Sequence, residues 1–152
     1  MPALNQESNL PPLFERLLGL ERSLGLPCEI LVVDDASEDG TLSVAEAAAR
    51  VHPQIRALHK PLPHGVGRAV RFGLGHARGK MVVVVMADGV DPLESAVREF
   101  CGRVLREGCH LVLLSRYTND ADAATIPMSY RLFQTVFRLL TMKLMGLPFR
   151  DT

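Results

Sequence analysis

The sequence has few cysteines, no excess of either charge and no long apolar run, and each absence excludes a class of protein. Seventeen Lys and Arg balance seventeen Asp and Glu, which argues against a nucleic-acid partner recruited by bulk charge. The three cysteines have neither CxxC nor metal-ligand spacing, so a disulfide framework and a zinc knuckle are disfavoured and a reduced, cytoplasmic protein is expected. The longest apolar stretch, Met81–Ala87, is far shorter than the ~20 residues of a membrane span.

Length and composition describe one ordinary domain. The 152 residues are 47% hydrophobic and 22% charged, which is enough apolar material for a core. No repeat, linker or low-complexity block divides them, so residues 1–152 are expected to form a single unit. Short β-branched runs alternate with segments of helical periodicity, the βαβ pattern. These runs are Glu29–Val33, Ile55–Leu58, Met81–Met86 and Leu111–Leu114.

The alternation predicts an α/β fold, a three-layer α/β/α sandwich with a mostly parallel sheet. Met81–Met86 is apolar at nearly every position, as in a central strand that is covered on both faces. Helices are expected after Asn9, or Ser8, and after Pro92, and the apolar stripe of the second places Cys101 in the core. In such sheets ligands bind beyond the carboxyl ends of the strands, so the polar residues found there are the candidate site.

The first strand end carries two adjacent carboxylates, Asp34 and Asp35. Such a pair is unfavourable unless a cation or hydrogen-bond donors meet it. A nucleotide base or a ribose diol supplies donors, so both residues are expected to contact a ligand. The following Asp39–Thr41 is interpreted as a turn and a helix cap.

The strand end after Met81–Met86 carries Asp88 and Asp91. Carboxylate oxygens at this edge suit a hard cation, Mg²⁺ or Mn²⁺, which also takes diphosphate oxygens. Asp88 is expected to serve this site. For Asp91 two interpretations stay open, a metal ligand and a cap of the helix that opens at Pro92.

The segment Gly65-Val66-Gly67-Arg68 resembles a dinucleotide phosphate loop only superficially. The last glycine of a GxGxxG pattern is replaced by Val70, and no acidic residue follows about twenty positions later. Gly65 and Gly67 are instead expected to let the backbone approach a ligand at a helix N-terminus. Arg68 faces either the pocket or solvent.

Taken together, these motifs resemble the family 2 glycosyltransferases of the GT-A fold, particularly the branch of dolichol-phosphate and polyprenyl-phosphate sugar transferases. The resemblance covers nearly the whole chain. Its carriers are Pro2–Leu10, Val32–Thr41, His64–Ala69, His76–Gly79, Ala87–Asp88, Ser115–Tyr117 and Arg150–Thr152.

The resemblance implies a transferase of cell-envelope glycan biosynthesis that uses a nucleotide-diphospho-sugar donor and a lipid-phosphate acceptor. In that branch a lipid phosphate oxygen attacks the anomeric carbon of the sugar, a nucleoside diphosphate leaves, and the cation stabilises the leaving charge. Asp35 then contacts the base or ribose and Asp88 belongs to the metal and diphosphate site. The remaining implied roles are nucleotide-pocket residues at Pro2, Asn5 and Glu7, and acceptor-phosphate residues at Arg116 and Arg131.

Two departures from the family pattern matter. Met86 stands where most members have the first carboxylate of D-x-D, and a thioether is a poor ligand for a hard cation, so weakened metal binding is expected. Met1 and Thr152 fall inside family motifs, so the domain is expected to be truncated at both ends. These departures keep a second hypothesis open, a nucleotide-binding remnant without turnover. A receiver-type signalling module is a third, disfavoured because the spacing of its acidic residues does not match.

Near residues 129–145 apolar side chains recur at helical spacing opposite a cationic stripe. Such an amphipathic helix suits a membrane surface, here the inner face, where a lipid-linked acceptor lies. The alternative is a core helix or a helix at a homo-oligomer interface.

Overall fold

The computed structural model describes residues 1–89, 92–110, 112, 135–137, 139 and 143. The chain divides into two compact units, Met1–Cys109 and His110–Thr152, and each is described by itself. In the second unit residues 135–137, 139 and 143 are helical, so the amphipathic helix predicted near 129–145 falls largely outside the described residues and stays a prediction. The same holds for the strand predicted at Leu111–Leu114. Within the described part of the chain, no helix has the length and apolar character needed to cross a membrane.

The first unit alternates strands and helices, as the βαβ pattern predicts. Its strands form one parallel sheet in the order β1-β2-β3. Two of the four strands predicted from the β-branched runs, Glu29–Val33 and Ile55–Leu58, are confirmed to within one residue. The elements are β1 Pro2–Ala3, α1 Leu10–Leu24, β2 Ile30–Asp34, α2 Thr41–Val51, β3 Ile55–His59, α3 Val66–His76 and α4 Leu93–Glu107.

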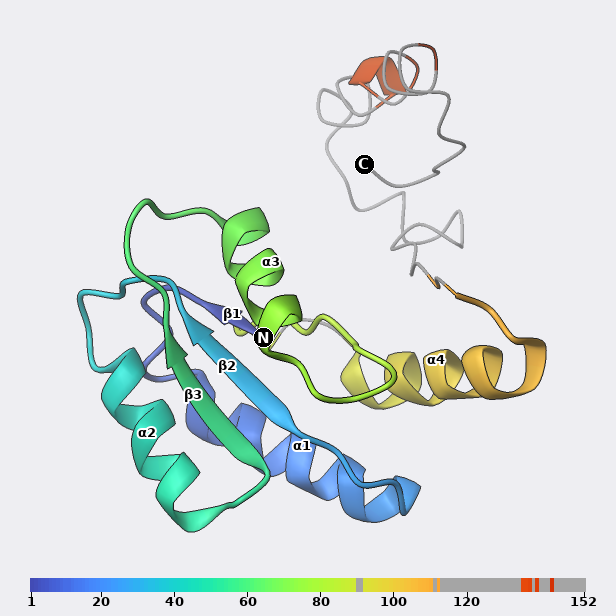
Figure 1. Ribbon diagram of the computed structural model, residues 1–152, viewed down its shortest axis with the longest axis horizontal. Helices are drawn as coiled ribbons and strands as arrows, with labels where there is room; N and C mark the ends of the chain where they lie inside the picture. The colour runs from blue at the N-terminus through green and yellow to red at the C-terminus, as the bar shows by residue number, and fades with distance from the viewer. Residues whose placement is uncertain (90–91, 111, 113–134, 138, 140–142, 144–152) are drawn as a thin grey trace. The chain divides into compact units, whose positions relative to one another are not determined.

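Helices cover both faces of this sheet, which confirms the three-layer arrangement (Figure 1). Alternate residues of β2 point to opposite faces. Val32 is fully buried and packs in a core cluster with Phe14 of α1 and Ala45 of α2. On the other face α3 comes so close that a Cβ added at Gly73 would lie 3.1 Å from the Val33 side chain. The strand therefore has one helix layer on each side.

The helix boundaries follow the sequence signals. Helix α1 begins after Asn9, has proline in its first turn and ends at Gly25, whose φ of 63° is left-handed, the usual glycine stop. Helix α4 begins after Pro92, and Cys101 is buried on it, as its apolar stripe predicts.

The expectation that Met81–Met86 forms a central strand is wrong. This segment belongs to none of the three strands of the sheet, and Val82 and Val84 are each 49% exposed. The physical reason lies in β1, the strand beside which it would pair. That strand has only two residues, and Pro2 has no N–H with which to donate to a neighbouring strand.

Candidate functional site

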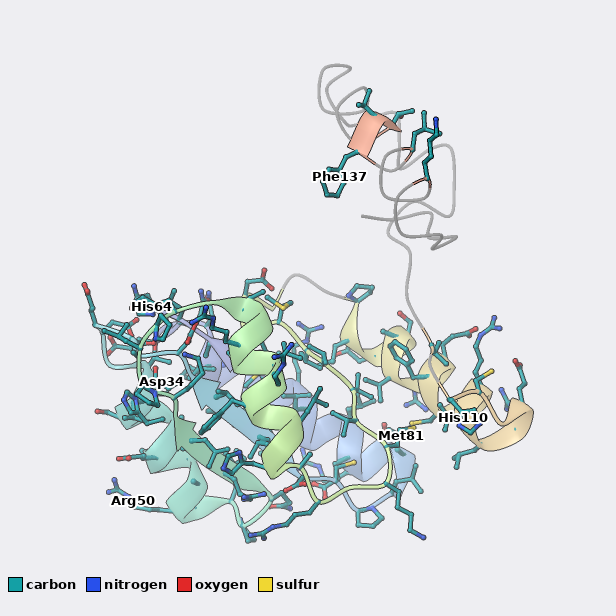
Figure 2. All side chains as sticks on the ribbon, turned by 45° about the horizontal axis from the view of Figure 1, so that its top comes forward. Asp34, Arg50, His64, Met81, His110 and Phe137 are labelled. Atoms are coloured by element: carbon teal, nitrogen blue, oxygen red, sulfur yellow. The ribbon has the colours of Figure 1, made fainter. Side chains whose placement is uncertain are left out.

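A cleft of about 350 Å³ lies at the carboxyl edge of the sheet, where the topology rule places ligands. Its walls come from β1, from the loops after β2 and β3, and from the segment that carries Asp88. Figure 2 shows Asp34 and His64 at this end of the sheet and Arg50, in the last turn of α2, at the other. Residues that line the cleft include Pro2, Asp35, His64, Gly65, Met86 and Asp88.

Asp35 is the buried carboxylate of the cleft. It directly follows β2, and only 3% of its surface is exposed. The ammonium of Lys60, which follows β3 and is also buried, lies 2.6 Å from Asp35 Oδ1. Lys60 directs hydrogen bonds at the carbonyl oxygens of Pro61 and Pro63, at 2.9 and 2.8 Å. The Lys60 ammonium therefore holds Asp35 Oδ1 while it also donates to two backbone carbonyl oxygens.

The loop before α3 holds the other side of the same carboxylate. The Gly65 N–H donates to Asp35 Oδ2 at 2.7 Å, and His64 Nδ1 lies 2.6 Å from the Asp35 carbonyl oxygen. Gly65 adopts a φ of 148°, which L side chains rarely take. The glycine at this position therefore permits the backbone turn in which the N–H of residue 65 donates to Asp35.

These contacts decide the ionisation of Asp35. Burial by itself raises the pKa of the carboxyl, but the Lys60 hydrogen bond, the Gly65 N–H and the Lys60 charge together outweigh it. The pKa of Asp35 therefore lies below its ordinary value of 3.8, and the cleft contains a carboxylate anion at neutral pH.

Asp34 lies outside the lining of the cleft. Its side chain is 1% exposed, and its two oxygens contact groups of the protein itself: Oδ1 accepts from the Ser37 N–H at 3.2 Å and Oδ2 lies 2.8 Å from His59 Nδ1. Because successive strand residues point to opposite faces, the structure separates two carboxylates that the sequence places together.

Asn5 and Glu7 connect two loops beside the cleft and are absent from its lining. The Asn5 side chain accepts a hydrogen bond from the Glu38 N–H at 3.0 Å, and Glu7 Oε2 accepts from the Gly40 N–H at 2.9 Å. A Cβ at Gly40 would lie 2.5 Å from Glu7 Oε1, so glycine permits this contact. Both residues thus support the loop that carries Asp35 and do not face the cleft.

Two further predicted residues lie at the N-terminus of α3. A Cβ added at Gly67 would meet no atom within 4 Å, so the surroundings do not require a glycine there. Arg68 is exposed and is not among the residues that line the cleft. Neither placement decides whether they contact a ligand, and both roles stay predictions.

Asp88 and Met86 both line the cleft, and Asp88 is exposed. No group of three or more His, Cys, Asp or Glu side chains placed to hold a metal occurs among the described residues. Asp91 lies outside them, as do Arg116 and Arg131. Two carboxylates thus line the cleft among the described residues: Asp35, which is paired with Lys60, and Asp88.

The structure thus brings together Pro2, Asp35, Gly65 and Asp88 from four separate parts of the sequence. Sequence reasoning missed Lys60. The available signal was its position directly after an apolar strand, at the same sheet edge as the aspartate pair, whose repulsion already required a cation.

Comparison of the sequence with known proteins shows the family to which this chain belongs. Residues 1–151 match the model of Glycosyl transferase family 2. A dolichyl-phosphate beta-glucosyltransferase of Drosophila melanogaster is 32% identical over 136 residues, which are 81% of this chain and 42% of that protein. One from Trichomonas vaginalis is 30% identical over 133 residues, 82% of this chain and 41% of that protein.

An undecaprenyl-phosphate 4-deoxy-4-formamido-L-arabinose transferase of Shewanella sediminis is 32% identical over 96 residues, 62% of this chain and 29% of that protein. The chain thus spans less than half the length of each of these three relatives. The family match covers the strand ends and the cleft described above, on the parallel α/β architecture expected of the GT-A fold. The chain belongs to Glycosyl transferase family 2.

Proposed function

We propose that this chain is the donor-binding part of a glycosyltransferase that moves a sugar from a nucleotide-diphospho-sugar to a polyprenyl or dolichyl phosphate. The acceptor class is supported by the names of the relatives, which transfer sugars to dolichyl or undecaprenyl phosphate. The proposal covers the activity of the whole protein, of which the present residues supply the donor side.

The observation that carries the proposal is the Asp35 carboxylate. It is ionised, almost fully buried and among the residues that line the cleft, and the Lys60 ammonium and the Gly65 N–H hold it in place. A carboxylate that lines a cleft accepts hydrogen bonds from a bound ligand, since each of its oxygens has more than one lone pair. The N–H of a nucleotide base and the hydroxyls of ribose are donors of this kind, so the nucleoside is proposed to bind against Asp35.

The diphosphate is proposed to lie between Asp88 and the N-terminus of α3. The 11-residue helix begins at Val66, and its first N–H groups favour an anion. Mg²⁺ or Mn²⁺ is proposed to bind through Asp88 and the diphosphate oxygens, with Asp91 as a further ligand. When bound, the cation neutralises the charge of the leaving nucleoside diphosphate.

Arg116 and Arg131 are proposed to bind the acceptor phosphate, since a guanidinium donates paired hydrogen bonds to phosphate oxygens. A phosphate is already ionised and needs no strong general base. Contact of the 129–145 segment with the inner face of a membrane is proposed on its amphipathic pattern. Self-association through the same segment is the competing proposal.

Nucleotide binding is tested by melting temperature, because a ligand that binds only the native state raises it. We expect one of UDP, GDP or CDP with Mn²⁺ to raise the melting temperature, and Asp35→Asn to remove this rise. Asp34→Asn is the matched control: an adjacent, equally buried aspartate outside the cleft, whose substitution should leave the rise intact. Each variant is first melted without ligand to confirm that it folds. Loss of the rise in Asp34→Asn alone would contradict the assignment of Asp35.

Turnover is tested separately with labelled nucleotide sugars and a polyprenyl phosphate. We expect labelled lipid, and lower acceptor affinity in Arg116→Ala and Arg131→Ala. Nucleotide binding without any product from the full-length protein would instead support the second hypothesis, an inactive nucleotide-binding remnant, which Met86 in place of a carboxylate favours.

A further inference from the structure

The loop of residues 86–89 carries Asp88 to the donor cleft without support from the sheet. The residues before it, 81–86, belong to none of the three strands that the described part of the chain forms. Met86, Ala87 and Asp88 nevertheless line the cleft. Contacts other than strand pairing therefore decide where the Asp88 carboxylate lies.

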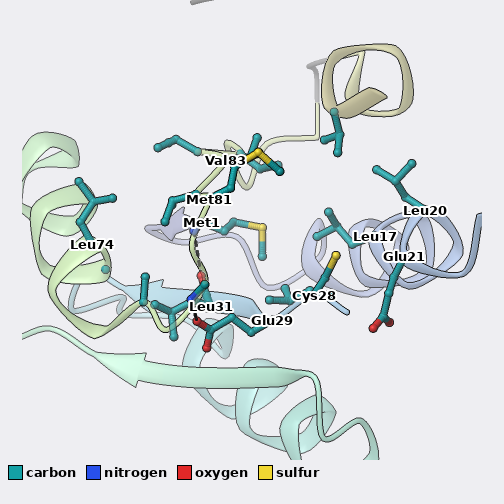
Figure 3. A pocket seen from close by; sticks show the side chains of 18 of the residues that line it. Met1, Leu17, Leu20, Glu21, Cys28, Glu29, Leu31, Leu74, Met81 and Val83 are labelled. Carbon is teal, nitrogen blue, oxygen red and sulfur yellow. Dashed lines mark hydrogen bonds between the residues drawn. The ribbon is translucent and has the colours of Figure 1, made fainter. Parts of the chain in front are cut away.

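Apolar packing against α1 holds the start of this loop. Ala87 is 2% exposed and lies in a core cluster with Phe14 of α1, and Val85 lies in a second cluster with Leu13 of the same helix. Figure 3 shows further apolar side chains of α1 and of the segment before the loop around a neighbouring cavity: Leu17, Leu20 and Val83. Helix α1 is thus the element against which residues 83–87 pack.

Arg16, also on α1, binds the end of the loop. Its Nη1 donates to the Gly89 carbonyl oxygen at 3.0 Å. Gly89 has a φ of 70°, a left-handed conformation that glycine adopts freely, and its N–H donates a long hydrogen bond, 3.4 Å, to the Met86 carbonyl oxygen. Asp88 therefore lies between a buried residue, Ala87, and a residue whose carbonyl group is bound by a guanidinium.

Glu94 holds the Arg16 guanidinium in this direction. Arg16 Nε and Nη2 each donate to one oxygen of Glu94 at 3.1 Å, which is the paired geometry of an arginine and a carboxylate. Glu94 lies in the first turn of α4, where the helix dipole favours an anion, and the Arg16 hydrogen bond lowers the pKa of its carboxyl below 4.5. Two donors thus fix the plane of the guanidinium while Nη1 reaches the loop.

We infer that Arg16 is a positioning residue of the donor site: through the Gly89 carbonyl group it fixes the loop that presents Asp88 to the diphosphate and its cation. The inference rests on the proposed function, which assigns Asp88 to the diphosphate side of the cleft. Arg16 is not among the residues that line the cleft, so it acts through the backbone of the loop and not on the ligand.

The exposure of the ion pair separates this role from a role in folding. The Arg16 and Glu94 side chains are 36% and 54% exposed, and ion pairs at such positions contribute little to stability. A residue that orients a metal ligand, in contrast, typically changes metal affinity by about tenfold or more when it is replaced. The dependence on Asp88 is greater because Met86 offers the cation a thioether and no carboxylate.

The test compares Arg16→Gln with a matched control, Arg98→Gln, in the full chain. Arg98 of α4 donates to Ser23 Oγ of α1 at 2.9 Å, so it joins the same two helices by a hydrogen bond that does not involve the loop. Three quantities are measured for each variant. They are the melting temperature, hydrogen exchange at the Gly89 amide without ligand, and Mn²⁺ affinity, from the spectrum of free Mn²⁺, with whichever of UDP, GDP or CDP raises the melting temperature of the original protein.

We expect Arg16→Gln to speed exchange at Gly89 about tenfold and to weaken Mn²⁺ binding about tenfold or more, with little change in melting temperature. Binding of the nucleotide without metal, which depends on Asp35, should be retained. Arg98→Gln should change none of these quantities. A lysine donates to one partner but lacks the fork that holds two, so Arg16→Lys should give a Mn²⁺ affinity between those of the original protein and Arg16→Gln.

The outcomes distinguish this inference from the proposed function. If the original protein binds nucleotide and Mn²⁺ but Arg16→Gln binds Mn²⁺ equally well, or if Arg16→Gln and Arg98→Gln lose affinity equally, only the role of Arg16 is overturned. Loss of metal-free nucleotide binding in Arg16→Gln would show a general structural defect and would also overturn it. If none of the three nucleotides binds the original protein, the proposed function fails, and unchanged exchange at Gly89 would then overturn the Arg16 contact by itself.

Discussion

The two ends of the three-stranded sheet have opposite chemistry. At the carboxyl end Asp35 and Lys60 are both buried and lie 2.6 Å apart, beside loops joined by side-chain hydrogen bonds. At the amino end a cavity of about 590 Å³ is lined mainly by apolar side chains. The buried ammonium of Met1 lies beside it, and no carboxylate of the described residues is within 4.0 Å of that ammonium. The same strand, β2, runs between the two.

The difference separates a binding edge from a packing edge. A buried ion pair adds little stability over a well-packed apolar pair of the same volume, so the Asp35–Lys60 pair is better explained by what it presents to the cleft. The amino end, in contrast, presents side chains that gain free energy only when more apolar surface covers them. The following predictions test this separation, from the largest expected effect to the smallest.

Lys60→Met should have the largest effect. It removes the cation and leaves the Asp35 carboxylate buried without a partner charge, which costs about 3–5 kcal/mol of unfolding free energy. The measurement is urea unfolding near neutral pH. The double variant Asp35→Asn, Lys60→Met should recover most of this loss, because no charge then remains buried. If Lys60→Met by itself were as stable as the original protein, the assignment of a buried Asp35–Lys60 ion pair would be contradicted.

The Met1 amino group should make stability depend on pH near neutrality. Its folded pKa of about 6 lies below its unfolded value of 8.0, so between these values the unfolded state binds more protons and stability rises with pH. Two pKa units correspond to about 3 kcal/mol, fully gained above pH 8 and fully lost below pH 6. Acetylation of Met1 removes the titrating group and should flatten this dependence.

The stability that the carboxyl end contributes should change in a different, acidic pH range. Asp35 has a lowered pKa, so its contribution to stability is present above its unfolded value of 3.8 and is lost as the pH falls through the folded pKa. Acetylated protein should therefore keep its acid-induced loss of stability while it loses the dependence between pH 6 and 8. If stability showed one pH transition only, and acetylation of Met1 removed it, the two ends of the sheet would not titrate separately and the comparison between them would be contradicted.

Ala36→Gly should have the smallest effect, a gain of about 1 kcal/mol. Ala36 follows Asp35 with a φ of 57°, a left-handed conformation that is unfavourable for alanine and free for glycine. Ala45→Gly in the interior of α2 is the control and should destabilise, because it weakens the helix and removes a buried methyl group. Equal losses in the two variants, measured by urea unfolding, would show that the Ala36 backbone is unstrained.

Much of the fold follows from local pattern. The strands β2 and β3 and the helices α1 and α4 were predictable because apolar periodicity, proline and glycine act over a few residues. The conformation of Met81–Met86 was not predictable. Its composition is that of a buried strand, but whether it joins the sheet depends on a neighbouring strand that offers N–H and C=O groups. That neighbour is distant in sequence.

The candidate site divides in the same way. The sequence by itself determined that carboxylates and glycines gather at one edge of the sheet, because parallel strands all end there. Only the tertiary structure decided that Asp35 lines the cleft while Asp34 contacts Ser37 and His59, and that Lys60 is the cation paired with Asp35. Residue order determines which side chains reach an edge, whereas burial, charge and direction depend on groups that only folding brings within a few ångströms.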